Sequence, residues 1–262
     1  MDNKTTRRSF LKVSALAGAA SALSPASVMA SAVPGDMIED KTKGLVFLFQ
    51  GDSITDGNRG RDKDPNHIMG HGYAFSVASR IGADFAESNP VFYNRGISGN
   101  RVTDLEKRWQ TDGLDIKPDV LSILVGINDG AVMIKEPEVK EATIDQFENS
   151  YRIILAKSKQ QNPDTLFVLC LPFVYPVGRV KDDWEKYRST VDQLAGRIRK
   201  LAAEFNSVLV DFPAVFDKAI KRKPAEYWIW DGIHPTVPAH ELMAREWIKQ
   251  VGVRLKFLEK YK

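Results

Sequence analysis

The chain of 262 residues has few cysteines and histidines, and each shortage excludes a class of protein. Its only cysteine, Cys170, cannot form an internal disulfide, so we expect a small buried side chain in a fold that depends on its hydrophobic core. Two of the four histidines, His67 and His71, stand near Asp62 and Asp64 with a spacing that matches no metal-binding motif. We therefore predict a solvated loop there and no metal site.

The sequence also lacks the features of a cofactor enzyme or a multidomain chain. It contains no glycine-rich phosphate loop and no dinucleotide-binding fingerprint, so we expect no organic cofactor. No linker rich in Pro, Gly or Ser and no internal repeat divides residues 44–262. We expect these residues to form one domain, and they carry no signal for an oligomeric state.

The chain has no excess of charge of either sign outside residues 1–32. The whole chain has a formal net charge of +3, with 37 basic and 34 acidic residues. Residues 1–32 contain four of the basic residues and one of the acidic residues, so the remainder is formally neutral. A neutral balance argues against a nucleic-acid partner held through its phosphates and against an anionic membrane as a partner.

Residues 1–32 have the layout of an export signal. A charged segment containing Arg7-Arg8-Ser9-Phe10-Leu11-Lys12 precedes a short apolar stretch over 13–22, and Ala30-Ser31-Ala32 matches a signal-peptidase site. The paired arginines resemble a twin-arginine signal, and the alternative is an ordinary secretory leader. The region around the cleavage site contains no cysteine, so we expect no lipid anchor there. No later apolar segment is long enough to span a membrane. We expect a periplasmic or extracellular protein whose residues 33–43 form a loose N-terminal arm.

The rest of the chain alternates short apolar runs with amphipathic segments. The runs predict buried strands, and the segments have the helical spacing of apolar residues. Continuous apolar strands separated by helices are typical of a parallel sheet covered on both faces, so we predict a three-layer α/β/α domain with five parallel strands. The predicted strands are 45–49, 91–93, 120–125, 166–171 and 208–210, and the predicted helices are 73–85, 147–159, 184–205 and 239–255.

Three long loops follow predicted strands, over residues 55–71, 172–183 and 212–232. In an open parallel sheet the carboxyl ends of the strands meet at one edge, where ligands bind. Gly51-Asp52-Ser53-Ile54 also lies at this edge, directly after the first strand. By themselves Gly, Asp and Ser are ordinary turn residues, so Ser53 is a candidate nucleophile only if a base and an oxyanion site exist elsewhere.

Asp231-Gly232-Ile233-His234-Pro235 supplies a candidate base. His234 can take the proton of Ser53 and return it to a leaving group, and Asp231 can orient the imidazole. Three donors are candidates for an oxyanion site: the backbone N–H groups of Ser53 and Gly99, and the side-chain amide of Asn128. The ordinary interpretations are a helix-entry turn for Asp231 and His234, a plain turn for Gly99 and an Asx turn for Asn128.

Gly51-Asp52-Ser53-Ile54, Ser98-Gly99, Gly126-Ile127-Asn128-Asp129 and Asp231-x-x-His234 occur in one order along the chain. This set resembles the SGNH hydrolases, also called the GDSL esterase/lipase family. The resemblance implies a flavodoxin-like fold and an acyl-enzyme mechanism, with Ser53 as nucleophile, His234 as base, Asp231 as its orienting residue, and Gly99 and Asn128 as oxyanion donors. Two departures are Ile54, where the motif name has Leu, and Asn100, where many members have Asp.

Other candidates are weaker. Ser98 does not lie in Gly-x-Ser-x-Gly, because position 100 is Asn, so it is a poor nucleophile. An oxygen cage for Mg²⁺ is conceivable, but most of its members have simpler expected roles in turns or beside His234, and we predict none; these members are Asp52, Asp56, Asp129 and Asp231. His240, near the start of the last helix, is expected to be structural or exposed.

We expect a serine esterase that removes acetyl or other short acyl groups from carbohydrate. Trp228 and Trp230 lie beside His234 in the sequence and are candidates to stack on sugar rings, and Asp52 is a third candidate for substrate binding. One alternative is a lipase or lysophospholipase that acts on longer acyl esters. The other is a carbohydrate-binding domain without catalysis, with a surface of aromatic residues: Tyr175, Trp184, Tyr227, Trp228 and Trp230.

Overall fold

A computed structural model describes residues 43–62, 64–139 and 143–261. The predicted export signal over 1–32, and the predicted arm except for Lys43, lie outside the described residues.

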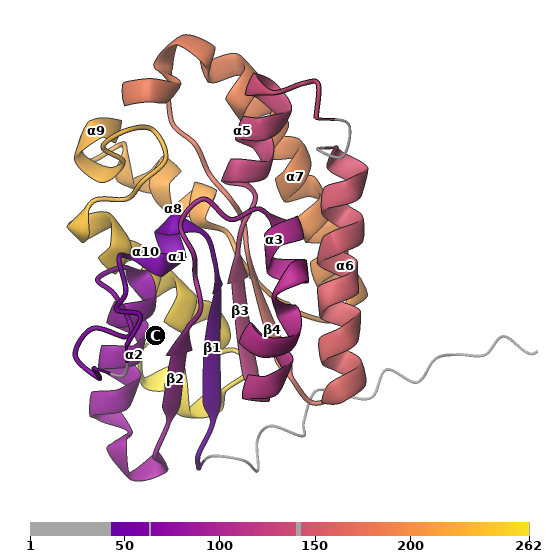
Figure 1. The fold of residues 1–262 in the computed structure, drawn as a ribbon. Helices are drawn as coiled ribbons and strands as arrows, with labels where there is room; N and C mark the ends of the chain where they lie inside the picture. The colour runs from indigo at the N-terminus through magenta and orange to yellow at the C-terminus, as the bar shows by residue number, and fades with distance from the viewer. Residues whose placement is uncertain (1–42, 63, 140–142, 262) are drawn as a thin grey trace, which may run out of the picture. The chain divides into compact units, whose positions relative to one another are not determined.

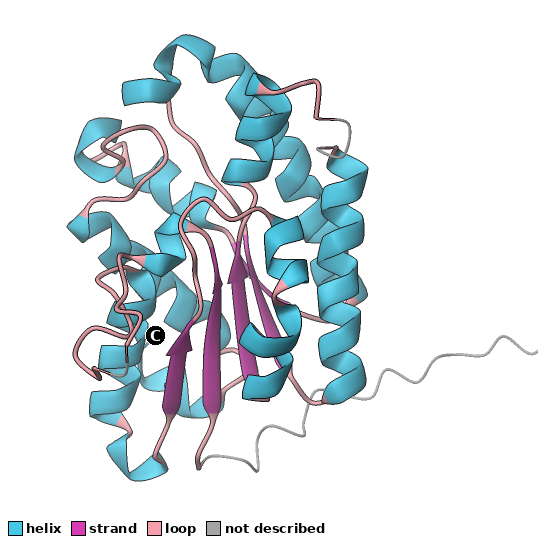
Figure 2. Cartoon of the chain, viewed as in Figure 1, coloured by secondary structure: helices cyan, strands magenta, loops and turns pink. Residues whose placement is uncertain are grey.

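Five parallel strands form one sheet, and the structure confirms all five predictions to within two residues at each end (Figures 1 and 2). The spatial order is β2-β1-β3-β4-β5, which is the flavodoxin-like order. In this order the chain changes direction across the sheet after β2, so β1 and β3 are neighbours at the switch point. The strands are β1 (Val46–Gly51), β2 (Val91–Asn94), β3 (Val120–Leu124), β4 (Leu166–Cys170) and β5 (Val208–Val210).

Helices cover both faces of the sheet, as predicted (Figure 1). One face packs against α2 (Tyr73–Asp84), α8 (Phe212–Ala219) and α10 (Val237–Val251). The other face packs against α3 (Val102–Lys107), α6 (Ile144–Gln161) and α7 (Trp184–Glu204). Shorter helices lie in the connections: α1 (Ser53–Asp56), α4 (Trp109–Asp112), α5 (Ile127–Lys135) and α9 (Ala225–Trp228).

The structure differs from the sequence prediction mainly in the helices of four to nine residues. The predicted loop over 212–232 contains α8 and α9, and the predicted turn at Asn128 is the first turn of α5. Local signals were present for α8, because the Asp211 carboxylate accepts a hydrogen bond from the Ala214 N–H and Pro213 occupies the first turn. Helices of four to nine residues offer too few turns for an apolar period to stand out.

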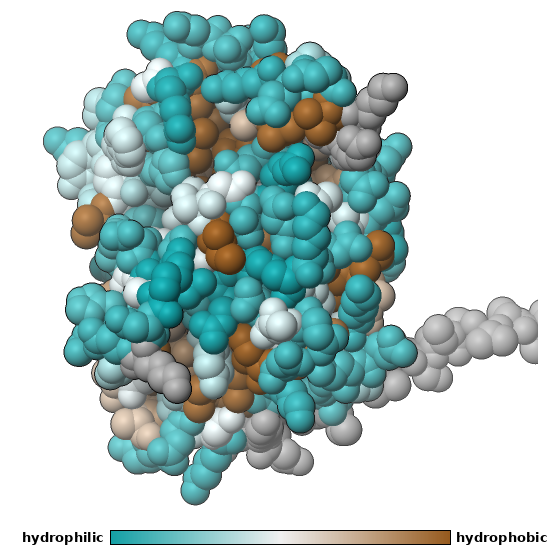
Figure 3. Space-filling model, viewed as in Figure 1, coloured by the Kyte–Doolittle hydropathy of each residue, from teal (hydrophilic) through white to brown (hydrophobic). Residues whose placement is uncertain are grey.

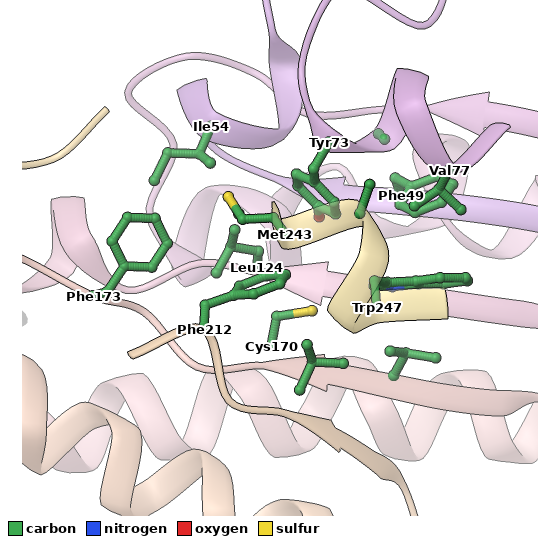
Figure 4. Packing of buried hydrophobic residues seen from close by; sticks show 14 of the residues in the cluster. Phe49, Ile54, Tyr73, Val77, Leu124, Cys170, Phe173, Phe212, Met243 and Trp247 are labelled. Carbon is green, nitrogen blue, oxygen red and sulfur yellow. The ribbon is translucent and has the colours of Figure 1, made fainter. Parts of the chain in front are cut away.

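Trp247 of α10 anchors the first face of the core (Figure 4). Its ring packs against Phe47 and Phe49 of β1, at centroid separations of 6.5 and 5.4 Å. Its indole N–H donates to the Ser122 hydroxyl at 2.9 Å, so the buried polar atoms satisfy each other. Cys170 is buried in the same cluster, where burial raises the pKa of its thiol to about 12, as expected for an unreactive packing residue.

Trp109 and Ser158 play the same part on the opposite face. The Trp109 indole N–H donates to the Ser158 hydroxyl at 3.0 Å, which links α4 to α6. Both helices pack on the strand residues that point to this face of the sheet. Every residue of β3 and β4 is therefore buried between two helical layers, which explains why the sequence shows apolar runs there rather than alternation. No helix among the described residues is long and apolar enough to cross a membrane.

Two buried carboxyl groups lie at the carboxyl edge of the sheet. Asp52 is 1% exposed and Asp129 is 5% exposed, and burial raises the pKa of each to about 7. Asp129 accepts hydrogen bonds from the Val102 N–H, so it ties the start of α5 to the start of α3. In the folded protein the Asp129 carboxyl therefore stays protonated until the pH approaches about 7, whereas in the unfolded chain it ionises at a lower pH.

This difference makes the stability contributed by Asp129 depend on pH. The contribution is complete below about pH 4 and is lost as the pH rises through about 7, because the folded state must then ionise a buried group. We expect the unfolding free energy of Asp129→Asn, relative to wild type, to rise by about 2–4 kcal/mol between about pH 4 and about pH 8. Urea denaturation at several pH values measures it, with Asp182→Asn on the surface as the control. Parallel curves for wild type and Asp129→Asn would contradict the prediction.

Candidate active site

Ser53 sits at the turn between β1 and α1, where the chain leaves the sheet. Gly51 approaches the neighbouring strand so closely that a Cβ there would meet the Leu124 carbonyl oxygen at 2.2 Å. The next residue, Asp52, caps α1 by accepting a hydrogen bond from the Ile54 N–H at 3.0 Å. Ser53 is the first residue of α1, so its own N–H has no acceptor within the helix and can bind an anionic oxygen.

Three predicted residues, from two distant parts of the chain, form one hydrogen-bonded row. The Ser53 hydroxyl lies 2.8 Å from Nε2 of His234, and Nδ1 of His234 lies 2.8 Å from Oδ2 of Asp231. With the proton on Nδ1 donated to Asp231, Nε2 is free to accept the hydroxyl proton of Ser53. The arrangement can therefore activate the serine as a nucleophile.

Asp231 is held in place by more than His234. Its Oδ1 accepts the backbone N–H groups of Ile233 at 3.0 Å and His234 at 2.7 Å. The Arg179 guanidinium lies 3.1 Å from Oδ2. Burial opposes ionisation of Asp231, but the hydrogen bonds from the backbone and ring of His234 and from Ile233 hold its pKa below the ordinary value. The carboxylate is thus ionised at neutral pH and fixed in orientation.

Contacts between loops position the segment that carries Asp231 and His234. Gly232 has a φ of +93°, and a Cβ there would meet the Val177 carbonyl oxygen at 2.5 Å. Its own carbonyl accepts the Tyr175 N–H at 2.9 Å. The loop after β4 therefore packs directly on the loop before α10, and only glycine fits at position 232.

The predicted oxyanion donors lie on two linked segments. The Asn128 amide, in the first turn of α5, donates to the Asn100 carbonyl at 3.1 Å, beside the turn that contains Gly99. Gly99 is exposed with a φ of +84°, and its N–H has no acceptor among the described residues. One hydrogen bond thus ties the α5 donor to the Gly99 turn, and the second amide hydrogen of Asn128 stays available.

The three residues predicted to bind substrate have different positions. Asp52 is buried as the cap of α1, and Trp228 is 4% exposed, with its indole N–H donated to the Lys223 carbonyl at 3.2 Å. Neither side chain is placed to contact a substrate, so these two predictions need correction. Trp230 is 62% exposed, and its ring stacks on His234 with centroids 6.2 Å apart and an interplanar angle of 25°. Neighbouring tryptophans in the sequence point differently because Trp228 belongs to α9 and Trp230 follows it.

A hollow of about 320 Å³ opens at Ser53 and His234 and is also lined by Trp230. Its wall includes two histidines that were not predicted for the site, His71 and His240. His240 is 8% exposed, its Nδ1 accepts the Tyr73 N–H at 3.1 Å, and burial lowers its pKa to about 4. It is a neutral structural residue at physiological pH. Its position one turn inside an amphipathic helix was the sequence signal from which its burial could have been predicted. A larger cavity of about 530 Å³ between α8 and α10 contains none of the predicted site residues.

Most of the residues considered for metal binding are engaged with other groups. His67 lies 2.5 Å from Asp64 in an exposed loop, and Asp56 forms a bidentate pair with Arg61. Asp52 and Asp129 accept backbone N–H groups. Within the described ranges no three His, Cys, Asp or Glu residues are grouped so that they could hold a metal ion.

The chain is similar in sequence and fold to known proteins. An acetylxylan esterase from Geobacillus stearothermophilus is 34% identical over 213 residues, which cover 80% of this chain and 94% of that protein. Its solved structure has a TM-score of 0.71 at 33% identity and covers 81% of this chain and 96% of that chain. A structure solved as a GDSL-like lipase from Parabacteroides merdae has a TM-score of 0.76 at 40% identity and covers 81% of this chain and 97% of that chain.

The family assignment follows from the sequence match together with the fold. Residues 49–242 match the GDSL-like lipase/acylhydrolase family, and this range includes all four motif segments. The five-stranded parallel sheet with helices on both faces is the fold of the similar structures. The chain belongs to the GDSL-like lipase/acylhydrolase family and is a carboxylic ester hydrolase.

Proposed function

We propose that this protein removes acetyl or other short acyl groups from carbohydrate, with Ser53 as the nucleophile. The observation that carries the proposal is the continuous row from the Ser53 hydroxyl through His234 to Asp231 at the wall of an open hollow. Two solved structures of the similar acetylxylan esterase are of catalytic mutants, one with a serine and one with an aspartate replaced by alanine. These are the residue types of Ser53 and Asp231.

In the first half of the proposed reaction the Ser53 oxygen forms a bond to the acyl carbon while its proton passes to Nε2 of His234. The tetrahedral intermediate then collapses, and the alcohol oxygen of the sugar leaves with that proton. In the second half a water molecule attacks the acyl-enzyme with His234 again as the base, which releases the acid and restores Ser53. Asp231 stays ionised throughout and stabilises the imidazolium.

Negative charge on the carbonyl oxygen requires donors that are already in place. We assign this role to the N–H groups of Ser53 and Gly99 and to the Asn128 amide. The first is the free N–H at the start of α1, and the other two are joined through the Asn100 carbonyl. Because these donors are fixed by the backbone, they need little rearrangement when the charge develops.

The shape of the hollow favours a short acyl group. Its volume is about 320 Å³, and its apolar lining among the described residues is confined to Ile54, Trp230 and Pro235 beside polar and histidine side chains. A long acyl chain would need a continuous apolar channel to be removed from water. The exposed ring of Trp230 at the wall provides a face on which a sugar can stack. These features favour a carbohydrate ester over the lipase alternative.

An ester panel tests the reaction and the acyl preference together. We expect p-nitrophenyl acetate and acetylated xylo-oligosaccharides to be hydrolysed, and p-nitrophenyl octanoate to react at least about tenfold more slowly in kcat/KM. Ser53→Ala should lose about 10³-fold or more in kcat and should not react with a fluorophosphonate probe. Preference for octanoate would favour the lipase alternative. Absence of probe labelling on the folded wild type would favour the non-catalytic alternative.

Replacement of Asn128 tests the oxyanion assignment. We expect Asn128→Ala to lower kcat by about 10²–10³-fold with little change in KM, because the lost donor acts mainly on the transition state. Asn100→Ala, which keeps the carbonyl that accepts from Asn128, is the control and should lose much less. Steady-state kinetics on p-nitrophenyl acetate with circular dichroism of both variants provides the measurement. A larger effect on KM than on kcat would assign Asn128 to ground-state binding instead.

We also propose export through a twin-arginine signal, which is supported by Arg7-Arg8 ahead of the apolar segment and by Ala30-Ser31-Ala32. In a bacterium with that pathway, the double variant Arg7→Lys with Arg8→Lys should stay in the cytoplasm as an uncleaved precursor. Lys4→Gln, which leaves the arginine pair intact, should be exported. Cell fractionation with immunoblotting distinguishes the two results, and export of the double variant would indicate an ordinary secretory leader.

A further inference from the structure

A second hollow lies beside the candidate active site, and three arginines line it. Its volume is about 620 Å³, and its walls include Arg59, Arg61 and Arg95. The two hollows are adjacent because Asp56 lines the one at Ser53, while its carboxylate accepts hydrogen bonds from Arg61 at 3.0 and 2.6 Å. Figure 3 shows strongly hydrophilic side chains over the loop after α1 and the end of β2.

The carboxylates near the three arginines are already engaged. Asp56 is paired with Arg61 and also accepts the Ser98 N–H at 2.9 Å. Asp112 lies 3.1 Å from Arg108 and only 3.7 Å from Arg95, so its closer partner is outside the hollow. Asp62, on the rim, accepts the backbone N–H of Asp64 at 3.0 Å. Asp56 and Asp112 attract Arg59 at longer range, but none of these three carboxylates forms an ion pair with it.

Arg59 is the arginine of this hollow that forms no ion pair among the described residues. It donates to the backbone carbonyls of Gly96 at 3.0 Å and Gly60 at 3.5 Å, and in the described part of the chain no carboxylate oxygen lies within 4 Å of its guanidinium. Burial and the like charges of Arg61 and Arg95 together lower its pKa to about 10, although the nearby carboxylates of Asp56 and Asp112 act in the opposite direction. A half-buried cation that faces two others is a site that an anion would stabilise.

We propose that this hollow binds the carboxylate of a uronic acid in the same glycan whose acetyl group enters the hollow at Ser53. The inference rests on the proposed carbohydrate esterase function and adds a preference for acidic glycans. A guanidinium presents parallel donors that match a carboxylate, and Arg59 and Arg95 both line the hollow that would hold it. The shared boundary at Asp56 and Arg61 means that a branched or adjacent sugar can occupy the second hollow while the ester reaches Ser53.

A matched pair of substrates tests the proposal. One is an acetylated xylo-oligosaccharide with a glucuronic acid branch, and the other is the same molecule with the branch carboxyl reduced to an alcohol. We expect wild type to favour the acidic substrate about tenfold in kcat/KM, and we expect Arg59→Gln to bring the ratio close to one. Arg245→Gln, which removes an exposed guanidinium on α10, should keep the wild-type ratio. Raising the ionic strength from about 0.05 to about 0.5 M should weaken the preference in wild type.

Two results would overturn the carboxylate site. One is an equal rate on both substrates in wild type, and the other is an equal loss on both substrates in Arg59→Gln, which would mean that Arg59 only tethers its loop to Gly96. Hydrolysis of neither substrate would instead count against the proposed esterase function. In that case calorimetric titration of Ser53→Ala with the same two oligosaccharides tests the site separately. Tighter binding of the acidic one would support it, and equal binding would refute it.

Discussion

The position of β1 between β2 and β3, in a parallel sheet buried on both faces, is the constraint on which the rest of this structure depends. Because the strands are parallel, the carboxyl ends of all five lie at one edge of the sheet. At the switch in strand order, the connections after β1 and β3 run to opposite faces and leave a crevice at that edge. Gly51 can pass against the Leu124 carbonyl only because it lacks a side chain, and this close approach fixes where α1 begins. Ser53 therefore receives its position from the backbone rather than from its own contacts.

The same edge gathers polar groups that the core would otherwise exclude. Asp231 is stabilised by backbone N–H groups and a ring N–H, so it remains ionised although it is largely buried. Asp52 and Asp129 have fewer donors, and burial raises the pKa of each to about 7. Carboxyl groups of one chemical type thus differ in charge according to the number of hydrogen bonds that each accepts. The ionised one lies beside His234, and the two others hold helix starts in place.

Much of this organisation could be predicted from local patterns. The five strands and four long helices are visible as apolar runs and helical periods, because burial on both faces leaves a continuous signal. Ser53, Asp231 and His234 were found because their order along the chain matches a family pattern. The short helices α5 and α8 were missed because eight or nine residues give too few turns for an apolar period to stand out, and the burial of Trp228 was missed because it depends on packing between segments. The contact of Arg179 with the His234 segment and the place of His240 at the wall of the hollow were not predicted, because each is set by a partner more than 50 residues away in the sequence.

By itself the sequence determined the fold class, the class of reaction and the identity of the three residues in the hydrogen-bonded row. These follow from residue type, order and periodicity, which are local properties of the chain. Only the tertiary structure decided which of two neighbouring tryptophans faces the hollow, which carboxyl groups stay ionised, and that Arg59, Arg61 and Arg95 line a second hollow beside Ser53. The physical reason is that exposure, desolvation and like-charge repulsion depend on distances between segments, and those distances exist only after the chain has folded.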